Sequence, residues 1–330
     1  ESGTCVSDIF FVDEERSFAW SENYIQHLGC DPTLSDSQVL QCIRSLDMGT
    51  VMAANMTGNT GFVPMMFPDM SWGATIDGQL LADTPFAIIS SGQSNQVPLI
   101  AGTNQDEGTI FSSMFQDMVP SISNPLKFGD MEAIMNHFFG DNATVISMVQ
   151  SIYPESAYAN ATLQVQTVIR DYFFLCPMSR ALLAQSEFGP QTWLYQFVYQ
   201  GHWIEDAFIG SDYHSAELEF VFNNPWPPLV HAFNARDQAM ATSFGTYWSN
   251  FVKYQNPNGP ADGSIKSNQP YWNPYEPTQL QSIAMDVPPS MTARLHEDRC
   301  QMWDKLAPWA PPLPKKMIRG RRKDRPIEFE

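Results

Sequence analysis

The spacing of apolar residues predicts several amphipathic helices along the chain. Residues 21–48 have the pattern of two short helices separated by a polar loop, and either Ser35 or Asp36 is suited to cap the second helix. Residues 162–185 have a long helical pattern that ends shortly before a Gly-Pro pair. Residues 234–254 predict a further helix, which stops at a turn-rich segment.

Two other segments have the pattern of strands. Residues 97–101 form a short apolar run, which is typical of a buried strand in the centre of a parallel sheet. A second strand is predicted where aromatic residues alternate with other residues, at Trp193, Tyr195, Phe197 and Tyr199. Residues 51–80 are rich in Gly, Pro and Met and lack a regular period, so they are expected to form loops. Strands that alternate with helices predict an α/β fold, with a mostly parallel sheet covered by helices.

Composition and charge narrow the class of protein. The chain has 330 residues, of which 43% are hydrophobic and 13% aromatic, so it can bury a large core. Its formal net charge of −18 argues against nucleic acid or an anionic membrane surface as a partner, because both require a cationic face. No run of about eighteen or more apolar residues predicts a membrane span. The first residues do not resemble a signal peptide and there is no initiator Met, so the sequence is expected to be part of a longer protein.

The cysteines favour disulfides over a metal site. No Cys/His cluster has zinc spacing, so neither a metal nor a cofactor is expected, and two disulfides with one spare thiol are the simplest interpretation of Cys5, Cys30, Cys42, Cys176 and Cys300. The chain also contains three N-x-S/T acceptor sequences, at Asn55, Asn142 and Asn160. Together these features favour a secreted protein or one in the lumen of the secretory pathway.

The end of the sequence changes character. Residues 315–330 contain seven Lys or Arg against three acidic residues and few apolar ones. A segment of this kind predicts a disordered basic terminus, with a binding tail or processing site as the alternative. Residues 1–314 are therefore expected to hold the folded part of the chain.

Candidate catalytic groups follow the two predicted strands. Asp106 and Glu107 lie in a polar turn after the strand at residues 97–101, where an open α/β sheet places its functional groups. Of the six histidines, His202 and His214 follow the aromatic strand, where a ring nitrogen can reach a carboxylate. An acid followed by a histidine matches the order of a Ser-acid-His triad, but no G-x-S-x-G motif is present, and the segment at Gly92 lacks its second glycine.

Eight segments, taken in order, resemble the C-terminal part of the type-B carboxylesterases, the cholinesterase and lipase family within the α/β-hydrolase fold. The segments are "ESGT", "HLGC" with "QCIRSL", "IDGQLLADTP", "VPLIAGTNQDEGTIF", "IRDYFFLCP", "GSDYHSAELEFVF", "YWSNFVKYQNPN" and "RCQMWDKLAP", which cover residues 1 to about 309. The resemblance implies that residues 1–314 are the C-terminal portion of such a domain.

The resemblance also implies roles for individual residues. Glu107, rather than Asp106, falls on the triad acid, and His214 falls on the general base, which makes His202 a structural residue. Ser2 falls on a serine that supports the acid, and Glu217 on a buried glutamate near the histidine. It further implies disulfides Cys30–Cys42 and Cys176–Cys300, with Cys5 as the spare, and a substrate pocket lined by Phe67, Met70, Trp72, Ile110 and Phe111.

The expected function is the hydrolysis of a small-molecule or lipid ester. The nucleophilic serine and the oxyanion hole are expected upstream of this chain, so that the chain alone is inactive. The alternative is a cholinesterase-like binding or adhesion domain that retains the fold without the chemistry. Retention of both Glu107 and His214 favours the enzyme.

Overall fold

The computed structural model describes residues 1–7, 11–56, 74–112, 115, 119–201, 212–225, 232–264 and 267–306. The chain divides into two compact units. The larger unit consists of Glu1–Asp8 with Asp83–Trp309, and the smaller of Ile9–Ala82 with Ala310–Glu330. The predicted basic tail, residues 315–330, lies outside the described residues.

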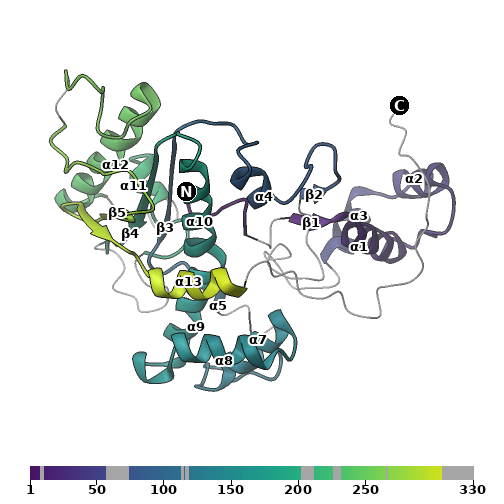
Figure 1. Cartoon of the computed structure of the whole chain (residues 1–330). Helices are drawn as coiled ribbons and strands as arrows, with labels where there is room; N and C mark the ends of the chain where they lie inside the picture. The colour runs from purple at the N-terminus through teal and green to yellow at the C-terminus, as the bar shows by residue number, and fades with distance from the viewer. Residues whose placement is uncertain are drawn as a thin grey trace. The chain divides into compact units, whose positions relative to one another are not determined.

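The larger unit is built on a four-stranded sheet with the order β3-β4-β5-β6 (Figure 1). β3 (Leu99–Asn104), β4 (Thr192–Phe197) and β5 (Gln281–Met285) are parallel, whereas β6 (Ser290–Ala293) pairs antiparallel with β5. The carboxyl ends of β3 and β4 therefore point to the same edge of the sheet. This edge is where functional groups of an α/β fold are expected.

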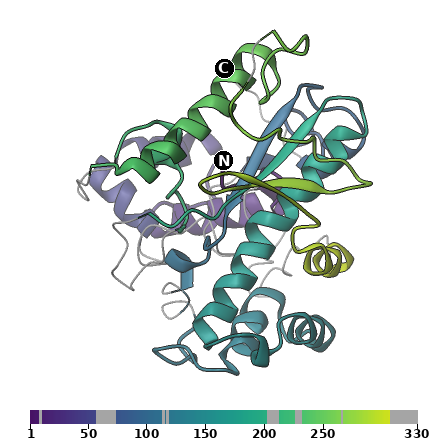
Figure 2. The same ribbon diagram turned by 90° about the vertical axis from the view of Figure 1, so that its left-hand side faces the viewer.

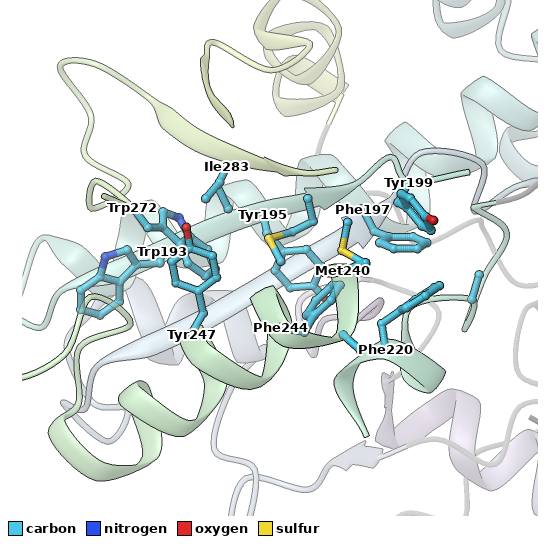
Figure 3. Close-up of a cluster of buried hydrophobic side chains, with 13 residues drawn as sticks. Trp193, Tyr195, Phe197, Tyr199, Phe220, Met240, Phe244, Tyr247, Trp272 and Ile283 are labelled. Atoms are coloured by element: carbon cyan, nitrogen blue, oxygen red, sulfur yellow. The ribbon is translucent and has the colours of Figure 1, made fainter. Parts of the chain in front are cut away.

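Every residue of β4 is buried, because helices cover both faces of the sheet. The aromatic residues on one face of β4 pack against α12 (Ala235–Tyr254). Figure 3 shows Tyr195 and Phe197 of the strand beside Phe244 of the helix. On the other face, Leu194 packs against residues of α10 (Cys176–Ser186). Figure 2 shows the sheet between these helical layers. The predicted α/β architecture is thus present in the larger unit.

Shorter helices complete this unit. They are α4 (Pro85–Ser90), α5 (Thr109–Ser112), α7 (Asp130–Phe139), α8 (Ala143–Ile152), the 3-10 helix η2 (Glu155–Ala157), α9 (Ala161–Ile169), the π-helix η3 (Arg170–Leu175), α11 (Leu218–Val221) and α13 (Glu297–Leu306). The helix predicted over residues 162–185 is therefore interrupted, because the six residues of η3 widen the turn between α9 and α10.

The helix predicted over residues 234–254 matches α12 closely. Its N-cap is Asn234, whose side chain accepts hydrogen bonds from the backbone N–H groups of Arg236 and Asp237. The helix ends where Gln255 adopts a left-handed conformation before the prolines.

The prediction of a buried central strand at residues 97–101 was wrong in position and in setting. The strand begins at Leu99 and extends to Asn104, and Val97 and Leu99 are 53% and 40% exposed. β3 is the edge strand of the sheet within the described residues. Only its last three residues are buried, and these lead directly into the acidic turn.

The described residues of the smaller unit form three helices and a two-stranded parallel sheet. The helices are α1 (Glu14–His27), α2 (Asp36–Arg44) and α3 (Met48–Met56), and the strands are β1 (Phe11–Asp13) and β2 (Ala74–Ile76). As predicted, two helices flank a loop, and Ser35 is the N-cap of the second. The expectation that residues 51–80 are only loops was wrong, because α3 extends into them and β2 follows.

Two disulfides are present, and they have the pairings that the resemblance implied. Cys30 is bonded to Cys42 in the smaller unit, and Cys176 to Cys300 in the larger. Cys5 is a free, exposed cysteine.

Candidate active site

The turn after β3 is held in place by close packing against α9. β3 ends at Asn104, and residues 105–108 turn the chain into α5. A Cβ atom on Gly108 would lie 2.2 Å from the backbone oxygen of Gln166 in α9. Only glycine allows the turn to approach the helix so closely. Glu107 therefore lies on a turn that is held by β3 on one side and by the contact of Gly108 with α9 on the other.

Glu107 is fully buried, and both of its carboxylate oxygens accept hydrogen bonds. Oε1 accepts from the backbone N–H of Asn104 at 2.7 Å, and Oε2 lies 2.6 Å from Nδ1 of His214. A buried carboxylate is stable only when its oxygens are hydrogen-bonded or paired with a charge. Both oxygens of the buried carboxylate are therefore satisfied, one by its own strand and the other by Nδ1 of the imidazole.

His214 approaches from a loop that pairs with the acidic turn. Tyr213 forms an isolated parallel bridge with Asp106, which brings the two segments together. The imidazole ring is also in contact with two phenylalanine rings, Phe111 at 5.3 Å and Phe174 at 5.2 Å between centroids. These contacts limit the orientations that the ring can adopt. Its side chain remains 25% exposed, so it is accessible on one side.

The surroundings of His214 favour its protonated form. Burial lowers the pKa of the imidazole, but the hydrogen bond and the negative charge of Glu107 outweigh this effect and raise the pKa above its usual value. A histidine with this environment accepts a proton readily, as a general base must.

A second carboxyl group lies next to this pair. The side chain of Ser2 donates to Glu217 at 3.2 Å, and the amide of Asn104 donates to Glu217 and to the backbone oxygen of Tyr213, the latter at 2.6 Å. Burial, and after it the charge of Glu107, raises the pKa of Glu217 to about 7. Asn104 thus links the acid turn, the histidine loop and Glu217 in one network.

The structure brings together four of the residues singled out in the sequence, namely Ser2, Glu107, His214 and Glu217. Phe111 is buried in α5 against the imidazole, and Ile110 precedes it in the same helix, half-buried. The other expected pocket residues, Phe67, Met70 and Trp72, lie outside the described residues, as does His202.

The sequence did not single out two residues that contact the candidate site, Asn104 and Phe174. Asn104 occupies the last position of β3, immediately before the acidic turn, and a polar residue at that position could have been recognised as part of the site. Phe174 belongs to the π-helix η3, which no local pattern indicated, and its ring contacts that of His214.

The described residues offer neither a metal centre nor a membrane-spanning helix. They contain no group of three or more His, Cys, Asp or Glu that could hold a metal ion. None of their helices is both long enough and apolar enough to cross a membrane.

Comparison with known proteins decides the family. The sequence profile of the carboxylesterase family matches residues 1–303. The chain belongs to the carboxylesterase family. This membership implies the α/β-hydrolase fold, with which the parallel sheet and its covering helices agree, so the predicted fold class is confirmed.

Curated relatives of this family are similar over most of the chain. A cholinesterase of Mus musculus is 24% identical over 289 residues, which is 83% of this chain and 45% of the relative. An acetylcholinesterase of Leptinotarsa decemlineata is 24% identical over 269 residues, 76% of this chain and 41% of the relative. Thyroglobulin of Mus musculus is also 24% identical, over 278 residues, 80% of this chain and 10% of that protein. The chain thus spans less than half the length of the relatives it matches.

Proposed function

We propose that the chain supplies the acid and the base of a Ser-Glu-His triad in a secreted carboxylic ester hydrolase. Glu107 is the acid and His214 the base, while the serine and the oxyanion donors belong to a segment that precedes Glu1 in a longer protein. Residues 1–314 then form the C-terminal portion of one catalytic domain. Membership of the carboxylesterase family supports ester hydrolysis in general.

The observation that carries this proposal is the 2.6 Å contact between Nδ1 of His214 and Oε2 of Glu107. Because Nδ1 is engaged by the carboxylate, Nε2 is the nitrogen that takes the proton of the attacking serine. The imidazolium formed in that step is stabilised by the buried negative charge of Glu107. The same proton then passes to the leaving alcohol, and the cycle is repeated with water.

The substrate is a small-molecule or lipid ester whose acyl or alcohol part meets apolar residues. Phe111 and Phe174, which contact the imidazole ring, are the described residues placed to form that wall. Phe67, Met70, Trp72 and Ile110 remain predicted members of the same pocket.

A secretory route is part of the proposal. Two disulfides support it, because such bonds persist in oxidising compartments. Two candidate glycosylation sites, Asn142 and Asn160, are helix N-caps whose Oδ1 atoms accept backbone hydrogen bonds. This use of Oδ1 is compatible with a sugar on Nδ2. The third, Asn55, lies in α3.

The test is ester hydrolysis by the longest form of the protein that contains this sequence. His214→Ala is expected to reduce kcat for p-nitrophenyl esters by about 10⁴-fold or more, as loss of a triad member does. The control variants are His202→Ala, which replaces the other candidate base, and His27→Ala, which replaces an exposed histidine of the smaller unit; both should retain most of the activity. Full activity in His214→Ala would refute the assignment, and the 330-residue chain alone should show no turnover.

A second candidate function is a binding or adhesion domain without catalysis. The similarity to thyroglobulin favours it, because sequences of this family also occur in a protein that is not named for ester hydrolysis. The two functions differ in one measurable property. Absence of ester turnover in the longest form, together with an intact Glu107–His214 contact, would support the binding domain.

A further inference from the structure

Asn104 makes three different connections at the candidate active site. Its backbone N–H donates to Oε1 of Glu107 at 2.7 Å. Its side-chain amide donates to the backbone oxygen of Tyr213 at 2.6 Å, and Tyr213 directly precedes His214. The same amide donates to Oε2 of Glu217, three residues after the histidine. Asn104 therefore holds the acid through its main chain and both sides of the base through its side chain.

The chemistry of these partners fixes the orientation of the Asn104 amide. The backbone oxygen of Tyr213 and the carboxylate oxygen of Glu217 are both acceptors, so only the NH₂ group, with its two donors, serves both. Oδ1 is left to accept, and the hydroxyl of Ser2 donates toward it at 3.4 Å. Asn104 is fully buried, so loss of its amide would leave buried partners without a donor.

The loop around His214 has a backbone conformation that requires support. Ser215, the next residue, has a φ of 80°, in the left-handed region that is unfavourable for a residue with a Cβ atom. Such a conformation persists only where the surrounding structure holds it. The backbone oxygen of Tyr213 accepts from the amide of Asn104 and from the backbone N–H of Ala216 at 3.0 Å. The second bond closes the turn on itself, and the first ties that turn to the end of β3.

We propose that Asn104 is a positioning residue whose side-chain amide holds the loop around His214 at the distance from which Nδ1 reaches Glu107. Its effect on ester hydrolysis rests on the proposed function, whereas its effect on the imidazole does not. The bond to Glu107 comes from the backbone N–H of Asn104, which every substitution except proline retains. A change of the Asn104 side chain therefore acts on the histidine loop and leaves that bond to the acid in place.

The first experiment removes the amide with Asn104→Ala, in the longest form of the protein that contains this sequence. The loop should relax and the contact between His214 and Glu107 should lengthen. The pKa of His214, measured from its ring ¹H shifts, should then fall, because burial lowers it and the bond to Glu107 no longer compensates. For p-nitrophenyl esters, kcat should fall by about 10- to 100-fold with little change in KM. An unchanged pKa of His214 in Asn104→Ala would overturn the proposal, whatever happens to turnover.

The matched control is Asn258→Ala. Asn258 lies in the loop after α12, where its amide donates to the backbone oxygen of Trp272 at 2.9 Å and its Oδ1 accepts from the backbone N–H of the same residue at 2.7 Å. Its loss should lower the midpoint of thermal unfolding but leave the pKa of His214 and kcat unchanged. If Asn104→Ala gave this same result, Asn104 would have only a structural role.

The second experiment exchanges donor and acceptor, and it decides the proposal if Asn104→Ala does not fold. Asn104→Asp alone removes the donors and opposes two carboxyl groups, whereas its combination with Glu217→Gln restores one donor and one acceptor at the same net charge. The combined variant should have a higher midpoint of thermal unfolding than Asn104→Asp. It should also regain the low-field Nδ1 proton resonance of His214, which reports the bond to Glu107 and should be lost in Asn104→Asp. Absence of both recoveries would contradict the coupling between the two side chains.

A measurement on the wild type requires no variant to fold. The side-chain N–H protons of Asn104 should exchange with solvent far more slowly than those of exposed asparagines, because both are donated to buried acceptors. Rapid exchange would refute the bonds on which the positioning role depends.

These experiments distinguish failure of the positioning role from failure of the proposed function. If no form of the protein hydrolyses esters but the His214 titration and its Nδ1 proton respond to Asn104 as stated, the ester hydrolase is refuted and the positioning role stands. If esters are hydrolysed and Asn104→Ala leaves the pKa of His214 unchanged, the hydrolase stands and the positioning role is refuted.

Discussion

At the scale of single residues, the site depends on how Glu107 is buried. Its two oxygens are used by different partners, the backbone N–H of Asn104 and the ring of His214. The bond from Asn104 fixes the carboxylate relative to β3. The bond to His214 places the negative charge of Glu107 next to the imidazole. Removal of the charge should therefore change the histidine more than it changes the fold.

The corresponding prediction concerns Glu107→Gln. Without the negative charge, burial becomes the dominant influence on His214, so its pKa should fall from above 6.5 in the wild type to below that value. The raised pKa of the wild type stabilises the folded state fully below the unfolded value and ceases to do so as pH rises through the folded value, so the variant should lose stability most at acidic pH. NMR titration of the ring protons of His214 checks the shift. A pKa of His214 that stays raised in the variant would show that another group sets it.

At the scale of secondary-structure elements, the decisive unit is β3, the acid turn and α5 packed against α9. The turn can deliver Glu107 only because Gly108 meets the backbone of α9 without a side chain. Gly102 has a related role within β3, because a Cβ there would collide with the Tyr195 ring of β4. Close contacts with neighbouring residues, a backbone segment at Gly108 and an aromatic ring at Gly102, explain both positions better than the conformational freedom of glycine.

We expect Gly108→Ala to displace the acid turn. A Cβ atom 2.2 Å from backbone atoms cannot be accommodated by a side-chain rotation, so the turn itself must move. The expected cost is about 1–3 kcal/mol of stability, with a lower pKa of His214 as the contact with Glu107 lengthens. Chemical denaturation and the same NMR titration measure the two effects.

Gly245→Ala is the matched control for that substitution. Gly245 is exposed in α12, and a Cβ atom added there would have no heavy atom within 4 Å. This variant should be more stable than the wild type by about 0.5–1 kcal/mol, because alanine favours the helix interior. Equal effects of the two substitutions would argue against the close contact at Gly108.

At the scale of the whole molecule, each compact unit contains one disulfide. Cys30–Cys42 spans 12 residues in the smaller unit, and Cys176–Cys300 spans 124 in the larger. In the chain-entropy description, a bond that closes a longer loop removes more freedom from the unfolded chain. The two disulfides should therefore stabilise the protein by different amounts, and each should stabilise its own unit.

Replacing each pair of cysteines by alanine tests this expectation. Loss of Cys176–Cys300 should cost about 4–5 kcal/mol, and loss of Cys30–Cys42 about 3 kcal/mol. Hydrogen exchange read by mass spectrometry should show reduced protection in the larger unit for the first variant and in the smaller unit for the second. Loss of protection in both units from either variant would show that the two units unfold as one.

The sequence by itself determined the features that depend on neighbouring residues. The helical pattern of residues 234–254, the α/β class and the acidic turn after a predicted strand follow from local spacing and turn chemistry. The segments after the predicted strands narrowed the candidates to Asp106 or Glu107 and to His202 or His214, and the resemblance to the carboxylesterases selected Glu107 and His214. Their order along the chain matched a known arrangement of catalytic groups.

Only the tertiary structure decided what those residues experience. The contact between Glu107 and His214 joins positions 107 residues apart. The link through Asn104 and the ring contact of Phe174 with His214 likewise arise where distant segments pack together. The exposed start of β3 likewise depends on which strands pair with it. Burial and charge–charge interactions are set by three-dimensional proximity, so the protonation of these groups is a property of the packed molecule and of no single segment.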